Sequence, residues 1–103
     1  MKSSLQTLQR IQKFNIDEQR KILAELQTNE EKLQSSLERL NTEYEREKEF
    51  ASAHPGTGDF GAYTKRYLQY REAFERQLAA VRAEIEKAVS YTHLRAHETE
   101  ADL

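Results

Sequence analysis

Apolar side chains recur at helical spacing on both sides of one short segment that interrupts the pattern. Between residues 4 and 51 the chain has no proline and no glycine. From Leu33 to Tyr44 the apolar positions are separated by steps of four, three and four, which is typical of a coiled-coil helix. The apolar positions of this first segment include Leu5, Leu8, Ile11, Ile16, Leu23, Leu26, Leu33, Leu37, Leu40 and Tyr44.

The register of this first segment changes along its length. Leu23 and Leu26 share the register that begins at Leu33, whereas Leu8 and Ile11 do not. The sequence therefore predicts a shift of register near residues 12–22. Polar residues at 29 and 30 interrupt the apolar series, as polar positions that fix register do in coiled coils.

A second apolar series follows the interruption, at steps of three and four with one doubled four. The doubled step predicts an eleven-residue period, and Arg71 is expected on the polar face opposite. Each segment has one apolar stripe, so each helix needs a partner. The positions of the second series are Phe60, Tyr63, Tyr67, Tyr70, Phe74, Leu78, Val81 and Ile85.

The interruption contains the only proline and all three glycines, at Pro55, Gly56, Gly58 and Gly61. Proline lacks an amide donor and glycine favours turns, so both helices are expected to stop here. Thr57 or Asp59 is expected to cap the second helix. We predict an all-α fold, in which two long helices form an antiparallel coiled-coil hairpin with Tyr44 near Tyr67 or Tyr70. The predicted parts are residues 1–51 (first helix), 52–59 (loop) and 60–88 (second helix).

Composition narrows the function classes. The chain has 103 residues, of which 33% are charged and 37% are hydrophobic, and its formal net charge is −2. The two signs are interspersed, so the sequence does not predict a nucleic-acid interface. There is no cysteine, no long apolar run and no glycine-rich phosphate loop. We expect a cytoplasmic protein that is not an enzyme and has no catalytic residues, no cofactor and no metal site.

Residues 89–103 differ in residue pattern from the rest of the chain. The run from Val89 to Leu94 matches a sequencing adapter read in frame, GTC TCT TAT ACA CAT CTC. We interpret residues 89–103 as a non-native tail and expect the natural protein to leave this sequence near Ala88. The histidines at 93 and 97 have the spacing of helical metal ligands, which we attribute to chance within that tail.

Three stretches of the chain resemble the FliJ family of the bacterial flagellar type III export apparatus. They are Leu5 to Leu8, Glu30 to Tyr44, and Ala62 to Tyr70. The resemblance covers about residues 1–88 and implies an antiparallel coiled coil similar to the stalk of rotary ATPases. It also implies a stalk and escort role with three partners: the flagellar export ATPase, the export gate protein and export chaperones. The implied location is the cytoplasmic face of the inner membrane, which the protein contacts only through the export apparatus.

Two groups of side chains are candidates for partner binding, because apolar anchors at helical spacing suit a helix-in-groove contact. The alternative for both is packing within a coiled coil. A purely structural spacer or oligomerisation element, and a nucleic-acid-binding helical arm, stay open as alternative functions. The first group is Leu5, Leu8, Ile11 and Phe14, which this chain leaves without a natural partner helix. The second group is Leu37, Leu40, Tyr44, Tyr63, Tyr67, Tyr70 and Phe74.

Overall fold

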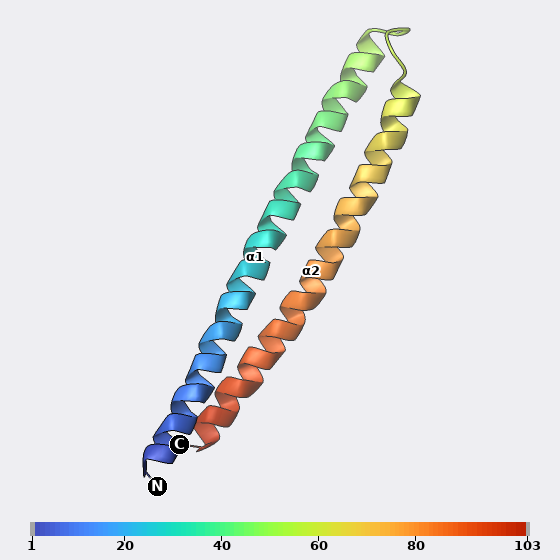
Figure 1. Ribbon diagram of the computed structural model, residues 1–103. Helices are drawn as coiled ribbons and strands as arrows, with labels where there is room; N and C mark the ends of the chain where they lie inside the picture. The colour runs from blue at the N-terminus through green and yellow to red at the C-terminus, as the bar shows by residue number, and fades with distance from the viewer. Residues whose placement is uncertain (1, 103) are drawn as a thin grey trace. The chain divides into compact units, whose positions relative to one another are not determined.

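The computed structural model describes the backbone of residues 2–102 and the side chains of residues 4–94. Two α helices make up this part of the chain: α1 spans Lys2–Ala53 and α2 spans Phe60–Asp102 (Figure 1). Within these residues there is no strand, and the predicted all-α helical hairpin is confirmed. Helix α1 ends two residues later than predicted.

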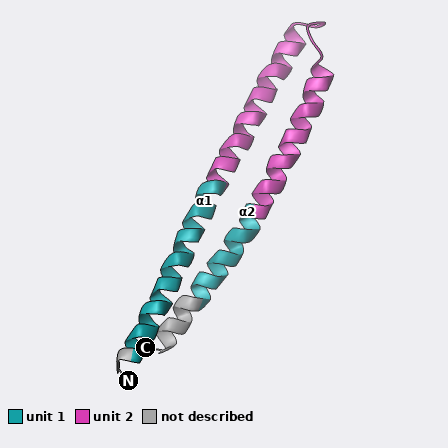
Figure 2. Ribbon diagram, in the orientation of Figure 1, with its two compact units in different colours: residues 1–29, 81–103 teal, residues 30–80 magenta. Residues whose placement is uncertain are grey.

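Two compact units share the helices (Figure 2). Unit 1 contains residues 1–29 and 81–103, and unit 2 contains residues 30–80. In each unit a segment of α1 packs against a segment of α2. Helix α2 continues through residue 88 into the segment interpreted as a non-native tail. A helical backbone does not test the origin of residues 89–103, so that interpretation stays a prediction.

The loop between the helices is built by its glycines and by two caps. Gly56 and Gly58 adopt positive φ angles of 86° and 80°, which side chains with a Cβ adopt only under strain. At the end of α1 the Thr57 hydroxyl donates to the carbonyl of His54 at 2.7 Å. At the start of α2 the Asp59 carboxylate accepts a hydrogen bond from the Ala62 amide at 3.0 Å. Asp59 is therefore the predicted cap of the second helix.

The interface in unit 2 follows a seven-residue repeat on both helices. From α1 the covered positions include residues 30, 33, 37, 40 and 44, which alternate in steps of three and four. On α2, Phe60, Thr64, Tyr67, Phe74 and Leu78 are covered, and the same alternation places Arg71 between Tyr67 and Phe74. Leu78 is the most deeply buried, at 4% exposed. Of the predicted series, Tyr70 lies outside this interface at 61% exposed, whereas Tyr63 is half-buried beside Thr64.

The interface in unit 1 also keeps one register. Its covered positions on α1 again alternate in steps of three and four, so the predicted shift near residues 12–22 is wrong. Three of these positions are glutamines, and the buried Ile16 lies among them. On α1 they are Gln9, Gln12, Ile16, Gln19, Leu23 and Leu26, and on α2 they are Val81, Ile85, Ala88 and Thr92.

Candidate functional site

The first group of candidates forms an exposed ridge near the start of α1, which we call the N-terminal ridge (Leu5, Leu8, Ile11 and Phe14). Their exposed fractions lie between 51% and 63%. Successive members are three residues apart. An α helix turns about 100° per residue, so each step of three rotates the next side chain by about 60° in the opposite sense. The ridge therefore winds across about half of the circumference of α1.

At this ridge the polar side chains lie on the packed face of α1 and the apolar side chains lie on its solvent face. Gln9 and Gln12 are half-buried on the side that packs within unit 1, whereas Leu8 and Ile11 face solvent. A helix that served only to pair with α2 would show the opposite arrangement, since burial of apolar surface drives pairing. The exposed apolar ridge therefore has the arrangement expected of a contact surface.

Aromatic rings from both helices stack in unit 2, and we call Tyr44, Phe60, Tyr63 and Tyr67 the aromatic layer. The ring centroid of Tyr44 lies 3.9 Å from that of Tyr67, 5.7 Å from that of Phe60 and 6.2 Å from that of Tyr63. This confirms the prediction that Tyr44 lies near Tyr67 or Tyr70, with Tyr67 as the partner. Stacking of this kind contributes about 0.5–1.5 kcal/mol per pair beyond surface burial.

Hydrogen bonds fix the two tyrosines at the centre of the aromatic layer. The Tyr67 hydroxyl donates to the side-chain oxygen of Asn41 at 2.5 Å. The Tyr44 and Thr64 hydroxyls are 3.3 Å apart. Asn41 and Thr64 were not predicted as partners, because isolated polar residues at the border of an apolar stripe give no sequence signal.

Arg71 extends out of the interface over the Tyr67 ring. Its guanidinium carbon lies 5.8 Å from the ring centroid, and its Nε lies 3.5 Å from a carboxylate oxygen of Glu75. The hydrogen bond with Tyr67, and next the charge of Glu75, raise the pKa of the Arg71 guanidinium above its usual value. A long side chain of this type covers apolar surface with its stem while its charge stays in water.

The second group of candidates divides between interface and surface. Tyr67 is 9% exposed and Tyr70 is 61% exposed. The other members are half-buried, namely Leu37, Leu40, Tyr44, Tyr63 and Phe74. Unit 2 therefore uses most of this group for its own packing, and Tyr70 is the member that faces solvent.

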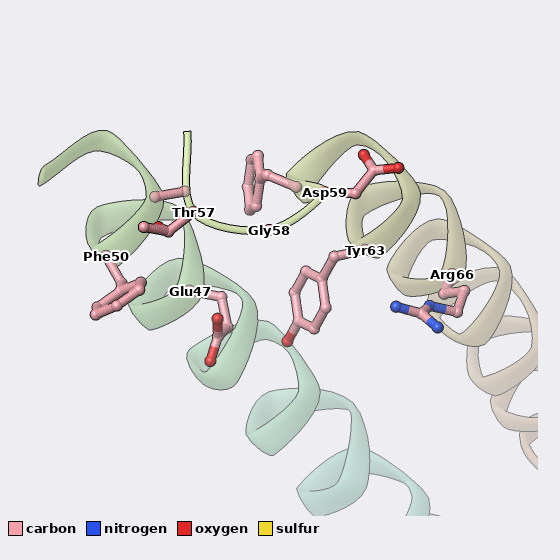
Figure 3. Close-up of a pocket in the computed structure, with 9 residues that line it drawn as sticks. Glu47, Phe50, Thr57, Gly58, Asp59, Tyr63 and Arg66 are labelled. Atoms are coloured by element: carbon pink, nitrogen blue, oxygen red, sulfur yellow. The ribbon is translucent and has the colours of Figure 1, made fainter. Parts of the chain in front are cut away.

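Two hollows border the aromatic layer. One of about 300 Å³ is lined by Leu40, Tyr63, Arg66, Tyr67 and Tyr70. The other, of about 200 Å³, lies beside the loop (Figure 3). Figure 3 shows Glu47 and Phe50 on α1, with the Tyr63 ring extending from α2 toward Glu47. Both hollows are shallow surface features lined in part by charged side chains.

Tyr63 lines both hollows, and its surroundings shift the pKa of its phenol. Desolvation by burial raises the pKa of the Tyr63 phenol, and the carboxylates of Glu47 and Glu43 raise it further. Arg66 acts in the opposite direction because its charge favours the phenolate.

The described residues contain neither a metal-binding cluster nor a stretch suited to crossing a membrane. In the part of the chain that the structure describes, no group of three His, Asp or Glu side chains is arranged to hold a metal ion. The side chain of His97 lies outside the described residues, so its spacing from His93 is not tested. Neither helix, over the same residues, contains a stretch long and apolar enough to cross a membrane.

Comparison with known proteins gave no relative. No protein-family model, no curated protein and no solved structure matches this chain.

Proposed function

We propose that this chain is a non-enzymatic, partner-binding helical hairpin of the bacterial flagellar type III export apparatus, with a stalk and escort role like that of FliJ. Its partners in this proposal are the export ATPase ring, the export gate protein and export chaperones. It acts at the cytoplasmic face of the inner membrane. The resemblance of residues 5–8, 30–44 and 62–70 to the FliJ family supports the identity of the apparatus.

The N-terminal ridge is the observation that supports binding as the mode of action. Four large apolar side chains, each more than half exposed, occupy consecutive steps of three on α1. Two packed helices offer ridges and shallow hollows rather than the deep concave pockets that enclose small molecules. Affinity must then come from apolar side chains that insert into grooves of a partner.

The expected contribution of the ridge is large. Full burial of a leucine or isoleucine side chain contributes about 1.5–3 kcal/mol. Leu8 is already half covered in the free chain, so its further burial is worth about half of that range. A change of 1.4 kcal/mol alters a dissociation constant about tenfold. Replacing Leu8 and Ile11 together with serine should therefore weaken ATPase binding by about tenfold or more.

The test is a titration of the whole chain against a purified flagellar export ATPase. The variants are Leu8→Ser, Ile11→Ser and their combination. The matched control is Leu68→Ser, because Leu68 is 46% exposed and Leu8 is 51% exposed, but Leu68 lies in unit 2. Helicity measured by circular dichroism should be preserved in all variants, since the changed side chains face solvent.

The outcomes separate the proposal from a purely structural role. Binding that is lost in the double variant and kept in Leu68→Ser supports the proposal. If the unaltered chain neither binds the ATPase nor changes its rate of ATP hydrolysis or its oligomeric state, the alternative of a coiled-coil spacer replaces it.

A further inference from the structure

The N-terminal ridge lies in a segment that carries only positive charge. Residues 1–16 contain Lys2, Arg10 and Lys13, and the first acidic residue of the chain is Asp17. From Asp17 onward the two signs are interspersed, and the whole chain has a formal net charge of −2. The exposed apolar surface of α1 therefore coincides with a local charge opposite to that of the protein.

The helical spacing places these cations at one border of the ridge. Arg10 precedes Phe14 by four residues, so the two are neighbours on the surface of α1. Lys13 follows Arg10 by three residues and continues the same border. Both side chains are exposed. The result is a band of apolar side chains with a basic margin, next to the glutamines that face the interior of unit 1.

We propose that the N-terminal ridge, with Arg10 and Lys13, is a docking site for an acidic helix-bearing surface of a protein partner. The apolar side chains supply the contact area, and carboxylates of the partner meet the basic margin. This inference deepens the proposed function and rests on it for the identity of the partner as the export ATPase. The chemistry of the partner surface rests only on the charge and geometry of α1.

The winding of the ridge favours a protein over a membrane surface. A basic amphipathic helix that lies on a bilayer needs its apolar side chains on one side, since the bilayer is flat on this scale. Leu5 and Phe14 are separated by about half a turn around α1, so one plane cannot contact both. A partner surface built from more than one helix can follow such a ridge, because it can curve around α1 and take the oblique row of residues three apart into its grooves.

The first arm of the test reverses the basic margin in the whole chain, with Arg10→Glu and Lys13→Glu together. Glutamate is a good helix former, so α1 should persist. The matched control is Arg39→Glu with Lys48→Glu in unit 2. Each reversal lowers the formal net charge by two, so both double variants pass from −2 to −6. Any difference in binding between the two double variants therefore reflects the position of the reversed charges and not the total charge.

Binding to the export ATPase should weaken by about tenfold in the ridge variant and change little in the control. The affinity of the unaltered chain should also fall as salt is added, because the screening length drops from about 10 Å at 0.1 M to about 3 Å at 1 M. The ridge variant should lose most of that dependence.

A second arm uses a pair of designed amphipathic helical peptides and does not depend on the flagellar assignment. Both peptides have the same leucine face, and one carries glutamates where the other carries lysines. The unaltered chain should bind the acidic peptide more tightly, and the ridge variant should prefer the basic one. Equal binding of the two peptides by the unaltered chain would overturn the inference.

The two arms distinguish failure of the inference from failure of the proposed function. If the ATPase does not bind the chain, but the ridge variant prefers the basic peptide as expected, the inference of an acidic partner surface is supported and the flagellar ATPase is rejected as the partner. If the ATPase binds through Leu8 and Ile11 but ignores the charge reversal, the proposed function stands and the acidic partner falls. Phosphatidylserine vesicles that bind the unaltered chain but not the ridge variant, without any peptide preference, would replace the protein partner with a membrane surface.

Discussion

Substituting two tyrosines three residues apart tests the register of the interface in unit 2. Tyr67 and Tyr70 are equivalent members of the aromatic series in the sequence, but Tyr67 is 9% exposed and Tyr70 is 61% exposed. We expect Tyr67→Ala to lower the free energy of unfolding much more than Tyr70→Ala. The gain in helix propensity from tyrosine to alanine is common to both variants, so it cancels in their difference.

The size of the difference follows from the contacts of Tyr67. The two exposed fractions differ by about half of a tyrosine, or about 100 Å² of the 150–250 Å² that an aromatic side chain buries. At about 25 cal/mol per Å² this is worth about 2.5 kcal/mol. Stacking on Tyr44 and the hydrogen bond to Asn41 add about 1 kcal/mol each. Because the unfolded chain already buries part of this surface, the expected difference is about 4 kcal/mol.

The measurement is urea unfolding of the whole chain, followed by far-ultraviolet circular dichroism. Tyr67→Ala should shift the midpoint to much lower urea or remove the cooperative transition. Tyr70→Ala should stay close to the unaltered chain, as surface substitutions do. Tyr67→Phe keeps the stacking and removes the hydrogen bond, so it should lie between them, at a cost of about 1 kcal/mol. Equal midpoints for the two alanine variants would refute the seven-residue register.

Substitutions at three further positions probe the cap, the interior of unit 1 and the pH dependence. Asp59→Ala should lower the free energy of unfolding by about 1 kcal/mol, because it removes the acceptor for the Ala62 amide. Asp59→Asn should retain most of the stability. If Asp59→Ala leaves the urea unfolding midpoint unchanged, the cap is unimportant. Thr92→Val should raise the free energy of unfolding by about 1 kcal/mol, because the described residues give the buried Thr92 hydroxyl no hydrogen-bond partner; a lower melting temperature would contradict this. The pKa of Tyr63 is raised in the folded chain, so the stability that this phenol contributes is present below pH about 10 and is lost as the pH rises through the folded-state pKa. Tyr63→Phe should therefore lose less stability than the unaltered chain above pH about 10, and identical pH profiles would exclude Tyr63 as the cause.

The candidate site was only partly visible in the sequence. The residues of the N-terminal ridge were recognised as candidates because the sequence leaves them without a natural partner helix, and their exposure was found in the structure. Its basic margin at Arg10 and Lys13 was equally present in the sequence, but the balanced charge of the chain as a whole hid it. Tyr44, Tyr63, Tyr67 and Tyr70 were predicted as members of one candidate group, which did not include Phe60. The division of that group into the buried Tyr67 and the exposed Tyr70 was not predicted.

The sequence by itself determined the elements of this protein. Fifty residues without a helix breaker dictate α1, since no backbone donor is lost there and no position favours a turn. The cluster of Pro55, Gly56 and Gly58 dictates the loop, because two positive φ angles are readily available only to glycine. Matched apolar stripes on either side of a short loop then leave antiparallel pairing as the way for each helix to bury its stripe.

The tertiary structure alone decided which side chains fill the interface. Hydrophobicity assigns Tyr63, Tyr70, Leu8 and Ile11 to the stripe, because each is more apolar than the neighbour one residue further along. Packing leaves Tyr70, Leu8 and Ile11 exposed and keeps Tyr63 half-buried, since a helix segment can turn only one face toward its partner and the majority of its positions sets that face. Once Tyr67 and Leu78 are buried, the seven-residue repeat carries Thr64 and Arg71 into line with them. In unit 1 the same constraint turns Gln9 and Gln12 inward and leaves the N-terminal ridge facing solvent, available to a partner.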